Sequence, residues 1–318
     1  MALAGGYAGT IRNLAVDAST KCIVQGLGKS STFHSKLALG MGTSIVGGVG
    51  PGKGGQSYLE RPVFNTVREA VHHLRPTATA VFVPPLAACG AILEAIEAEV
   101  PLIVSVAEGV PLKDQMTIMA ALHSQSKSRL VGANSPGMAN PRGCRLGISP
   151  PVTMAPGPVG IASRSGTLSY EAASSCKHIG QSYVLGLGGD FYPGTRTAEA
   201  LSFFMDDPTT EALILVGEVG GTMEEEAAEL LLRDKRYRDA EGCTRKPVVG
   251  FIAGRNVPPG KIFGHAGACW RDGLGSADQK RQAWTEAGIR VVDTIAETGA
   301  AIEEEMKKRG LFSHTSLG

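Results

Sequence analysis

The sequence predicts an α/β protein with two domains, each built on a doubly wound parallel sheet. Three observations lead to this prediction: a length of 318 residues, two successive series of alternating strand-like and helix-like segments, and a proline- and glycine-rich stretch between the two series. Domains commonly contain about 100–200 residues, so the length fits two of them. An apolar content of 43% is enough to form a sizeable core in each.

The first series extends from residue 22 to residue 134. Short β-branched runs predict strands at 22–26, 43–48, 78–84, 101–109 and 129–134. Helical periodicity predicts helices at 32–41, 65–75, 87–99 and 111–127. Because strands that alternate with helices form parallel βαβ units, we expect a doubly wound sheet here.

The domain boundary is expected in the stretch 140–160, which is too rich in proline and glycine for a regular element. The domains are therefore placed at 1–150 and 151–318. The second series predicts strands at 157–163, 183–189, 211–220, 246–254 and 289–294. It predicts helices near 167–178, 195–206, 222–236, 276–287 and 296–309.

Composition and charge argue against several classes of function. The 31 basic residues nearly cancel the 30 acidic ones, so no nucleic-acid partner is expected. No stretch approaches the ~18 consecutive apolar residues of a membrane span, so no membrane partner is expected either. None of the six cysteines forms a metal-binding pair, which predicts reduced intracellular thiols and no metal site. Residues 1–17 are interpreted as a flexible leader, with a remnant of a mitochondrial transit peptide as the alternative.

A glycine-rich turn follows the first predicted strand. Gly26 and Gly28 would let the backbone approach a phosphate group, and Lys29 and Ser30 lead into a helix expected to begin near Thr32. Free amide groups and the partial positive charge of a helix N-terminus suit an anionic ligand. A tight turn between strand and helix, without any ligand, is the alternative.

The second predicted strand argues against NAD as this ligand. NAD sites carry an Asp or Glu near the end of that strand to hold the ribose hydroxyls. This chain has instead Lys53, in a second glycine-rich loop. A lysine would pair with a phosphate of a ligand such as CoA, and a solvated loop lysine is the alternative.

Two further loops follow predicted strand ends, where doubly wound sheets bind their ligands. Val83 and Pro84 would offer an apolar surface to an adenine or pantetheine group. Ala107 and Glu108 lie at the end of the next strand. Simple strand termination is the alternative for both loops.

A cluster of hydroxyls opens the second domain. Ser163, Ser165, Gly166 and Thr167 follow a predicted strand and precede a predicted helix. Hydroxyls and free amides would therefore converge on a phosphoryl group. An ordinary helix cap by Ser165 is the alternative, although it explains only one of the serines.

His265 is the candidate nucleophile of the chain. Its small neighbours Gly264 and Ala266 predict an exposed, mobile imidazole, whereas four of the other histidines fall on polar helical stretches and are expected at the surface. Glu218 ends a strongly apolar strand, and its carboxylate would orient one imidazole nitrogen and leave the other free to attack phosphate. The alternative for Glu218 is an acid at a helix N-terminus, a role that the glutamates at 224–226 already fill.

The chain resembles the α subunits of succinyl-CoA synthetase over nearly its whole length. The segments that carry the resemblance are TFHS (32–35), GPGKGGQ (50–56), RPVFNTVREA (61–70), SRSGTLSYEA (163–172), GEVGG (217–221), EEEAAE (224–229) and GHAGA (264–268). ATP-citrate lyase is a more distant relative, which GGDFYPGT (188–195) resembles. The resemblance implies a Rossmann-like CoA-binding domain followed by a flavodoxin-like ligase domain.

The same resemblance implies roles for particular residues. His265 would carry the phosphate, Glu218 would support it, and the segment 163–167 would hold the phosphoryl group. The residues implied at the CoA and acid sites are Lys53, Val106, Ala107, Glu108 and Tyr170.

The reaction implied is a nucleotide-dependent acid–CoA ligation through a phosphohistidine and an acyl phosphate, with succinate or a related dicarboxylate as the acid. ATP or GTP and Mg²⁺ would be bound by a separate β subunit with an ATP-grasp domain, in a heterodimer or heterotetramer. The family implies the mitochondrial matrix, and a native Met start would imply the cytoplasm. A noncatalytic CoA-binding or scaffold subunit is the alternative, and the retained His265 and Glu218 argue against it.

The chain departs from the family pattern beside both sites. Its first glycine loop, GLGKSSTFH, is one residue shorter, and CWRDGLG (269–275) replaces a second glycine-rich stretch. If Trp270 and Arg271 face His265, they would favour a carboxylate other than succinate. The alternative is that Trp270 packs under the following helix and Arg271 faces solvent.

Overall fold

The chain divides into two compact units. The structure, a computed structural model, describes residues 6–271 and 274–311. The first unit extends to Pro151 and also includes Gly186–Thr195, whereas the second comprises Val152–Leu185 and continues from Arg196. The segment Gly186–Thr195 thus belongs to the first unit although it follows a strand of the second. The alternation of strands and helices in the sequence did not indicate that the chain returns to the first unit here.

The first unit is built on a sheet with the strand order β3-β4-β2-β1-β5-β6-β7. Its strands are β1 (Lys21–Gln25), β2 (Ser44–Val49), β3 (Ser57–Tyr58), β4 (Arg61–Phe64), β5 (Ala78–Val81), β6 (Leu102–Ser105) and β7 (Arg129–Val131). The central pairs are parallel, as predicted, and only the short edge strand β3 is antiparallel to its neighbour β4. The carboxyl ends of β1, β2, β5 and β6 therefore share one edge of the sheet.

Four helices accompany this sheet: α1 (Lys29–Gly40), α2 (Val67–Leu74), α3 (Pro85–Glu97) and α4 (Leu112–His123). Helix α1 begins three residues before the expected Thr32, because the Ser31 hydroxyl accepts a hydrogen bond of 2.8 Å from the Gly28 amide and so closes the first turn early. Pro85 occupies the first position of α3, where its missing amide hydrogen costs nothing.

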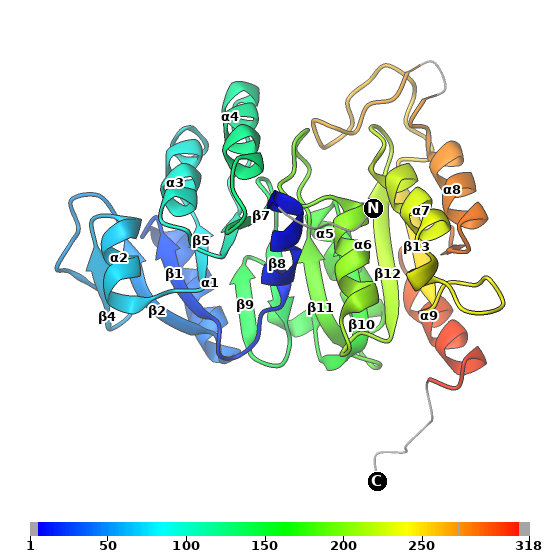
Figure 1. Cartoon of the computed structure of the whole chain (residues 1–318), viewed down its shortest axis with the longest axis horizontal. Helices are drawn as coiled ribbons and strands as arrows, with labels where there is room; N and C mark the ends of the chain where they lie inside the picture. Colours follow the sequence, from blue (N-terminus) through cyan, green and yellow to red (C-terminus); the bar gives the residue numbers. More distant parts are fainter. Residues whose placement is uncertain (1–5, 272–273, 312–318) are drawn as a thin grey trace, which may run out of the picture. The chain divides into compact units, whose positions relative to one another are not determined.

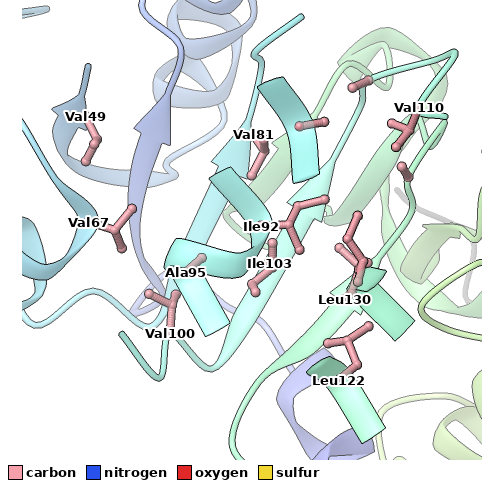
Figure 2. Close-up of a cluster of buried hydrophobic side chains, with 14 of the residues drawn as sticks. Val49, Val67, Val81, Ile92, Ala95, Val100, Ile103, Val110, Leu122 and Leu130 are labelled. Atoms are coloured by element: carbon pink, nitrogen blue, oxygen red, sulfur yellow. The ribbon is translucent and has the colours of Figure 1, made fainter. Parts of the chain in front are cut away.

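The larger hydrophobic cluster of the first unit lies between the sheet and helices α2, α3 and α4 (Figure 2), and α1 packs in a separate cluster through Ala38. Ile92 on α3 packs in one cluster with Ile103 on β6 and with Leu122 and Leu130, and all four side chains are buried. The cluster contains residues from both the strands and the helices. It holds the strands in register, and so it holds their carboxyl-terminal loops in place.

The N-terminal segment is ordered, contrary to the prediction of a flexible leader. Residues Gly6–Leu14 form a 3₁₀ helix, with Tyr7 and Leu14 buried. The guanidinium of Arg129 stacks on the Tyr7 ring at 4.0 Å and donates to the Tyr7 carbonyl at 2.8 Å. An arginine distant in sequence thus fixes the segment, which local composition does not reveal. Residues 1–5 of the predicted leader lie outside the described residues.

The stretch 140–160 was predicted to contain no regular element, and this prediction is wrong. It contains most of an antiparallel hairpin, β8 (Gly137–Asn140) and β9 (Cys144–Gly147), and the start of β10 (Pro156–Ser163). Glycine permits the close approach of the two hairpin strands, since a Cβ on Gly147 would lie 2.7 Å from the Cα of its pairing partner Gly137. The glycines that suggested a loop here are therefore part of the strand pairing.

The second unit contains strands in the order β14-β13-β12-β10-β11. Besides β10, these are β11 (Gln181–Gly186), β12 (Ala212–Glu218), β13 (Val248–Ala253) and β14 (Arg290–Val291). Its helices are α5 (Gly166–Ser175), α6 (Thr197–Asp206), α7 (Met223–Arg233), α8 (Ala277–Glu286) and α9 (Glu297–Lys308). Strand β12 pairs in parallel with β10 and β13, which confirms the predicted second parallel sheet.

The helices of the second unit form two contacting groups, α6 with α7 and α8, and α5 with α9. Figure 1 shows α7 and α8, in yellow and orange, beside β13, and between β13 and α8 a long orange loop. No helix among residues 6–271 and 274–311 is long and apolar enough to cross a membrane.

Candidate active site

His265 lies on the long loop between β13 and α8. Its backbone amide donates to the Phe263 carbonyl at 3.0 Å, and its carbonyl accepts from the Ala268 amide at 3.0 Å. Gly264 has φ +74°, a conformation that favours glycine. These bonds make a tight turn whose tip presents the imidazole.

The imidazole of His265 is held by a carboxylate. Its Nδ1 atom lies 2.6 Å from Oε2 of Glu218, the last residue of β12. The side chain of His265 is 23% exposed and that of Glu218 is 8% exposed. The predicted pairing of the two residues is therefore present, but the imidazole is partly buried and not fully exposed as expected, because a buried strand end holds the ring.

Glycines after β12 allow the histidine loop to approach. A Cβ on Gly220, which has φ +88°, would lie 2.2 Å from the Gly267 carbonyl oxygen. The Gly220 amide also donates to the Gly275 carbonyl at 2.8 Å. Gly220 thus fixes the loop against the end of the strand, and this places His265 beside Glu218.

Arg164 is a member of the site that the sequence interpretation did not single out. Its Nη2 atom lies 3.1 Å from Glu218 Oε1, and the side chain is buried. Within the described part of the chain, Arg164 Nε and Nη1 have no hydrogen-bond partner. The position of Arg164 between the two serines of SRSGT, directly before a helix, was the signal available in the sequence.

The start of α5 lies next to Arg164 in the chain. Ser165 is the N-cap, and its hydroxyl accepts from the Leu168 amide at 3.4 Å, while Ser163 Oγ accepts from the Ser165 amide at 3.2 Å. Over the described ranges, the amides of Gly166 and Thr167 have no acceptor. The capping role considered for Ser165 is therefore real, and two amides remain available to an anion. Tyr170 lies half-buried one turn further along α5.

The three glutamates at the start of α7 have partners of their own. Glu224 Oε2 lies 2.6 Å from Lys280 Nζ, and Glu225 Oε2 lies 2.7 Å from the same atom. Glu226 pairs with Arg196 at 2.7 Å. These acids lie in the first turn of α7, as expected, but they are fixed by cations as well as by the helix dipole.

This arrangement suits nucleophilic chemistry at one imidazole nitrogen. When the Glu218 carboxylate accepts a hydrogen bond from Nδ1–H, the lone pair of the imidazole is left at Nε2. Nε2 can then attack an electrophile such as a phosphoryl group. Because Arg164 lies on the other side of the carboxylate, Glu218 connects the nucleophile to the start of α5.

The first unit gathers the other predicted site residues at one sheet edge. Gly26 has φ +85°, and a Cβ there would lie 2.9 Å from the Phe82 backbone, so the β1 loop contacts the end of β5. Gly28 caps α1 without any side chain, which leaves the backbone around Lys29 and Ser30 exposed. An open depression of about 550 Å³ adjoins this turn. Its lining residues are Leu27, Gly28, Lys29, Thr32, Phe33 and Lys36.

The remaining predicted CoA contacts follow neighbouring strands of the same sheet. Lys53 is exposed, and its aliphatic stem packs over Gly50 in the loop after β2. Val83 and Pro84 connect β5 to α3. Val106, Ala107 and Glu108 follow β6, with Ala107 buried and Glu108 exposed. The parallel register therefore brings all four loops to one edge.

His34, on α1, is turned toward Arg145. Arg145 Nη2 lies 3.1 Å from His34 Nδ1 and Nη1 donates to the His34 carbonyl at 2.8 Å. Burial, and then the positive charge of Arg145, lower the pKa of His34. His34 therefore serves to fix α1 and is kept neutral. No group of three or more His, Cys, Asp or Glu side chains suited to a metal occurs in the regions that the structure describes.

Comparison with known proteins decides the family. The CoA binding domain family matches residues 17–109 and the CoA-ligase family matches residues 162–290. The succinate–CoA ligase [ADP-forming] subunit alpha of Staphylococcus aureus (strain Mu50) is 40% identical over 300 residues, which cover 93% of this chain and 96% of that protein. The chain belongs to the family of succinate–CoA ligase α subunits.

Solved structures agree on the fold of this family member. The ATP citrate lyase of Methanothrix soehngenii, in complex with citrate and coenzyme A, superposes with a TM-score of 0.83 at 21% identity. The match covers 96% of this chain and 53% of that one. A dinucleotide-forming acetyl-coenzyme A synthetase from Ca. Korarchaeum cryptofilum gives a TM-score of 0.66 at 18% identity, covering 88% and 59%. The chain thus spans little more than half the length of these two proteins.

The residues that depart from the family pattern after the histidine turn are placed as follows. The Trp270 indole nitrogen donates to the Val257 carbonyl at 2.9 Å, and Arg271 is exposed. Trp270 therefore packs on an earlier part of its own loop, not under the following helix. Asp272 and Gly273, which belong to the same departure, lie outside the described residues.

Proposed function

We propose that this chain is the α subunit of a nucleotide-dependent acid–CoA ligase in which His265 carries the phosphoryl group between two half-reactions. The observation that carries the proposal is the 2.6 Å contact between His265 Nδ1 and Glu218 Oε2 at the end of β12. A subunit that merely bound CoA would have no need of a buried carboxylate aimed at an imidazole.

The reaction would proceed in three steps. Nε2 of His265 attacks the terminal phosphorus of ATP or GTP, the bond to the leaving oxygen breaks, and the nucleoside diphosphate departs. A carboxylate oxygen of the acid then attacks the phosphorus, which frees the imidazole and gives an acyl phosphate. The CoA thiolate finally attacks the acyl carbon and expels inorganic phosphate. Two displacements at phosphorus let one residue accept and return the same group.

The phosphoryl group would be held by the start of α5. The unpaired amides of Gly166 and Thr167 and the partial positive charge of the helix suit a phosphate. In the described residues, the buried Nε and Nη1 atoms of Arg164 make no hydrogen bond, although Nη1 lies 3.6 Å from Glu224 Oε1, and an anion bound here would accept from them. Ser163 and Ser165 would support the turn through their local hydrogen bonds.

CoA would bind at the carboxyl edge of the first sheet. Lys53 supports this assignment as an exposed cation on the second loop, and Gly26 and Gly28 keep side chains out of the first. Val83, Pro84 and the segment 106–108 would border the remainder of the ligand. The acid is proposed to be succinate or a related dicarboxylate, with Tyr170 beside it.

A β subunit with an ATP-grasp domain is the proposed partner, because the related protein of Staphylococcus aureus is named as an alpha subunit. That partner would bind ATP or GTP, and Mg²⁺ would neutralise the phosphate charge there. We place the complex in the mitochondrial matrix or the cytoplasm, where its thiols stay reduced.

Ligase turnover with two matched variants tests the proposal. The chain, with its native β subunit, is assayed for acyl-CoA formation from succinate, CoA and ATP or GTP. His265→Asn is expected to lose activity by about 10³-fold or more, as for removal of a covalent nucleophile. His178→Asn is the control, since His178 also pairs with a glutamate, Glu303 at 2.9 Å, but at the surface. Full activity of His265→Asn would leave the noncatalytic scaffold as the better account.

A further inference from the structure

A chain of buried charges extends from the active carboxylate into the interior of the second unit. Glu218 contacts Arg164, Arg164 Nη1 lies 3.6 Å from Glu224 Oε1, and Glu224 Oε2 lies 2.6 Å from Lys280 Nζ. Lys280 lies on α8 and its side chain is 0% exposed. Its ammonium group bonds to the Gly221 carbonyl and to the carboxylates of Glu224 and Glu225, so any effect on His265 is indirect.

We infer that Lys280 is a positioning residue for phosphohistidine formation, acting through Glu224 and Arg164. The inference rests on the proposed function of His265. The fold brings Arg164 between two carboxylates, Glu218 and Glu224. The guanidinium lies closer to Glu218, at 3.1 Å, than to Glu224, at 3.6 Å, and this balance depends on what else neutralises each carboxylate.

Lys280 supplies a cation that competes with Arg164 for Glu224. With Nζ at 2.6 Å, Lys280 neutralises Glu224 and leaves Arg164 to Glu218, whose Oε1 is closer to the guanidinium than that of Glu224. Without Lys280, Glu224 would be a buried anion whose remaining cationic partner is Arg164, and attraction in a low-dielectric interior is strong. Arg164 would then move toward Glu224, and Glu218 would lose the contact that orients it on His265.

One glycine of β12 leaves space for the side chains of this buried charge network. A Cβ on Gly217 would lie 2.6 Å from the Glu224 side chain, so the strand must be bare where Glu224 passes. Glu224 Oε1 also accepts from the Glu218 amide at 3.2 Å, and the Trp284 indole donates to the Glu224 carbonyl at 2.8 Å. Strand end, α7 and α8 are therefore fixed relative to one another around one carboxylate.

The competition for Arg164 predicts a rescue that a simple loss of packing would not show. Lys280→Met removes the cation with little change in shape. Adding Glu224→Gln removes the rival anion while keeping an oxygen for the Glu218 amide. The double variant should therefore return Arg164 to Glu218, whereas damage to packing alone would accumulate.

The experiment measures the rate of phosphate transfer from labelled ATP to the chain in complex with its β subunit. Lys280→Met should slow this rate roughly 10-fold, within the about 10–100-fold range typical when a group behind a functional ligand is removed. The double variant should recover most of that loss, and the apparent KM for ATP should be unchanged in both. Ile302→Ala, a buried change on α9 without charge, lowers stability and should leave the rate unaltered.

Two results would overturn the inference: a Lys280→Met rate equal to that of the unmodified chain, or a double variant as slow as Lys280→Met. Thermal unfolding of each variant confirms that the folded protein is being assayed, and the charge-balanced double variant serves if the single one does not fold. Absence of label on the unmodified chain would instead reject the proposed function itself. The two failures are thus distinguished by the unmodified control.

Discussion

At His265, the proposed chemistry depends on the two imidazole nitrogens having different environments. Nδ1 is fixed by Glu218 at 2.6 Å, and the lone pair is thereby assigned to Nε2. The carboxylate itself lies at a buried strand end and contacts Arg164 at 3.1 Å. The Glu218 carboxylate therefore makes two interactions: it orients the imidazole ring, and it pairs with the Arg164 guanidinium at the start of α5.

Glu218→Gln tests this arrangement directly. The change keeps the size of the side chain and one acceptor oxygen but removes the charge. The rate of His265 phosphorylation should fall by about 10²-fold or more, as when the orienting partner of a catalytic histidine is altered. The free energy of unfolding should fall by less than about 2 kcal/mol, because Arg164 keeps Glu224 as a counter-charge.

Reactions with labelled ATP, quenched at successive times, give the rate of His265 phosphorylation, and urea denaturation gives the free energy of unfolding. If stability collapsed while phosphorylation persisted, Glu218 would be a structural residue and not the support of His265.

Individual site residues were predictable where a local pattern carried them. His265 has small residues on both sides, and Glu218 lies at the end of an apolar strand, so a local pattern pointed to each of them. Arg164, Glu224 and Lys280 did not, since their roles arise from contacts between segments 50 or more residues apart. The sequence also did not predict that the turn at His265 is held in place, because the residues that hold it, Glu218 and Gly220, lie at the end of another strand.

Among the elements, the loops that follow parallel strands carry the candidate site residues. In the first unit, the loops after β1, β2, β5 and β6 share one sheet edge because the strands pair in parallel with matched register. In the second unit, Glu218 ends β12 and the histidine loop follows the neighbouring strand β13. Both sites therefore follow from the same property of doubly wound sheets.

Lys53→Ala tests the assignment of the first sheet edge to CoA. The affinity for CoA should fall about 3–5-fold, corresponding to no more than about 1 kcal/mol, because Lys53 is exposed and its contact with a phosphate is screened by solvent. Calorimetric titration with CoA measures the change. Lys21→Ala, an exposed lysine at the opposite end of β1, is the matched control and should bind CoA normally.

An equal loss of affinity in the Lys53 and Lys21 variants would indicate a general charge effect, and unchanged affinity in the Lys53 variant would remove that residue from the CoA site.

Most helices and the longer parallel strands could be predicted, because hydrophobic runs and helical periodicity agree with the fold there, but the short strands β3, β4, β8 and β9 were not predicted. One source of error is glycine, which occurs both in loops and where two strands pair closely. In the hairpin β8–β9, glycines permit close strand pairing, whereas the same residues in a sequence indicate a loop. Helix α1 likewise began early because a serine three residues inside it closed the first turn on Gly28.

For the molecule as a whole, family membership and site geometry lead to the same reaction. The chain covers 96% of a succinate–CoA ligase alpha subunit at 40% identity, and its second unit pairs His265 with Glu218. Its nearly balanced charge, +1, fits a protein whose anionic ligands are bound at specific loops and not by a general field. We propose that one imidazole of this molecule, that of His265, receives a phosphoryl group and then passes it to the acid.

The most direct test locates that phosphoryl group. The chain and its β subunit are incubated with ATP labelled in the terminal phosphate, and the label is mapped by mass spectrometry of peptides prepared at alkaline pH. We expect a base-stable, acid-labile phosphate on His265 that disappears when succinate and CoA are added together. A label on another residue, such as Thr167, or a label on His265 that succinate and CoA fail to discharge, would contradict it.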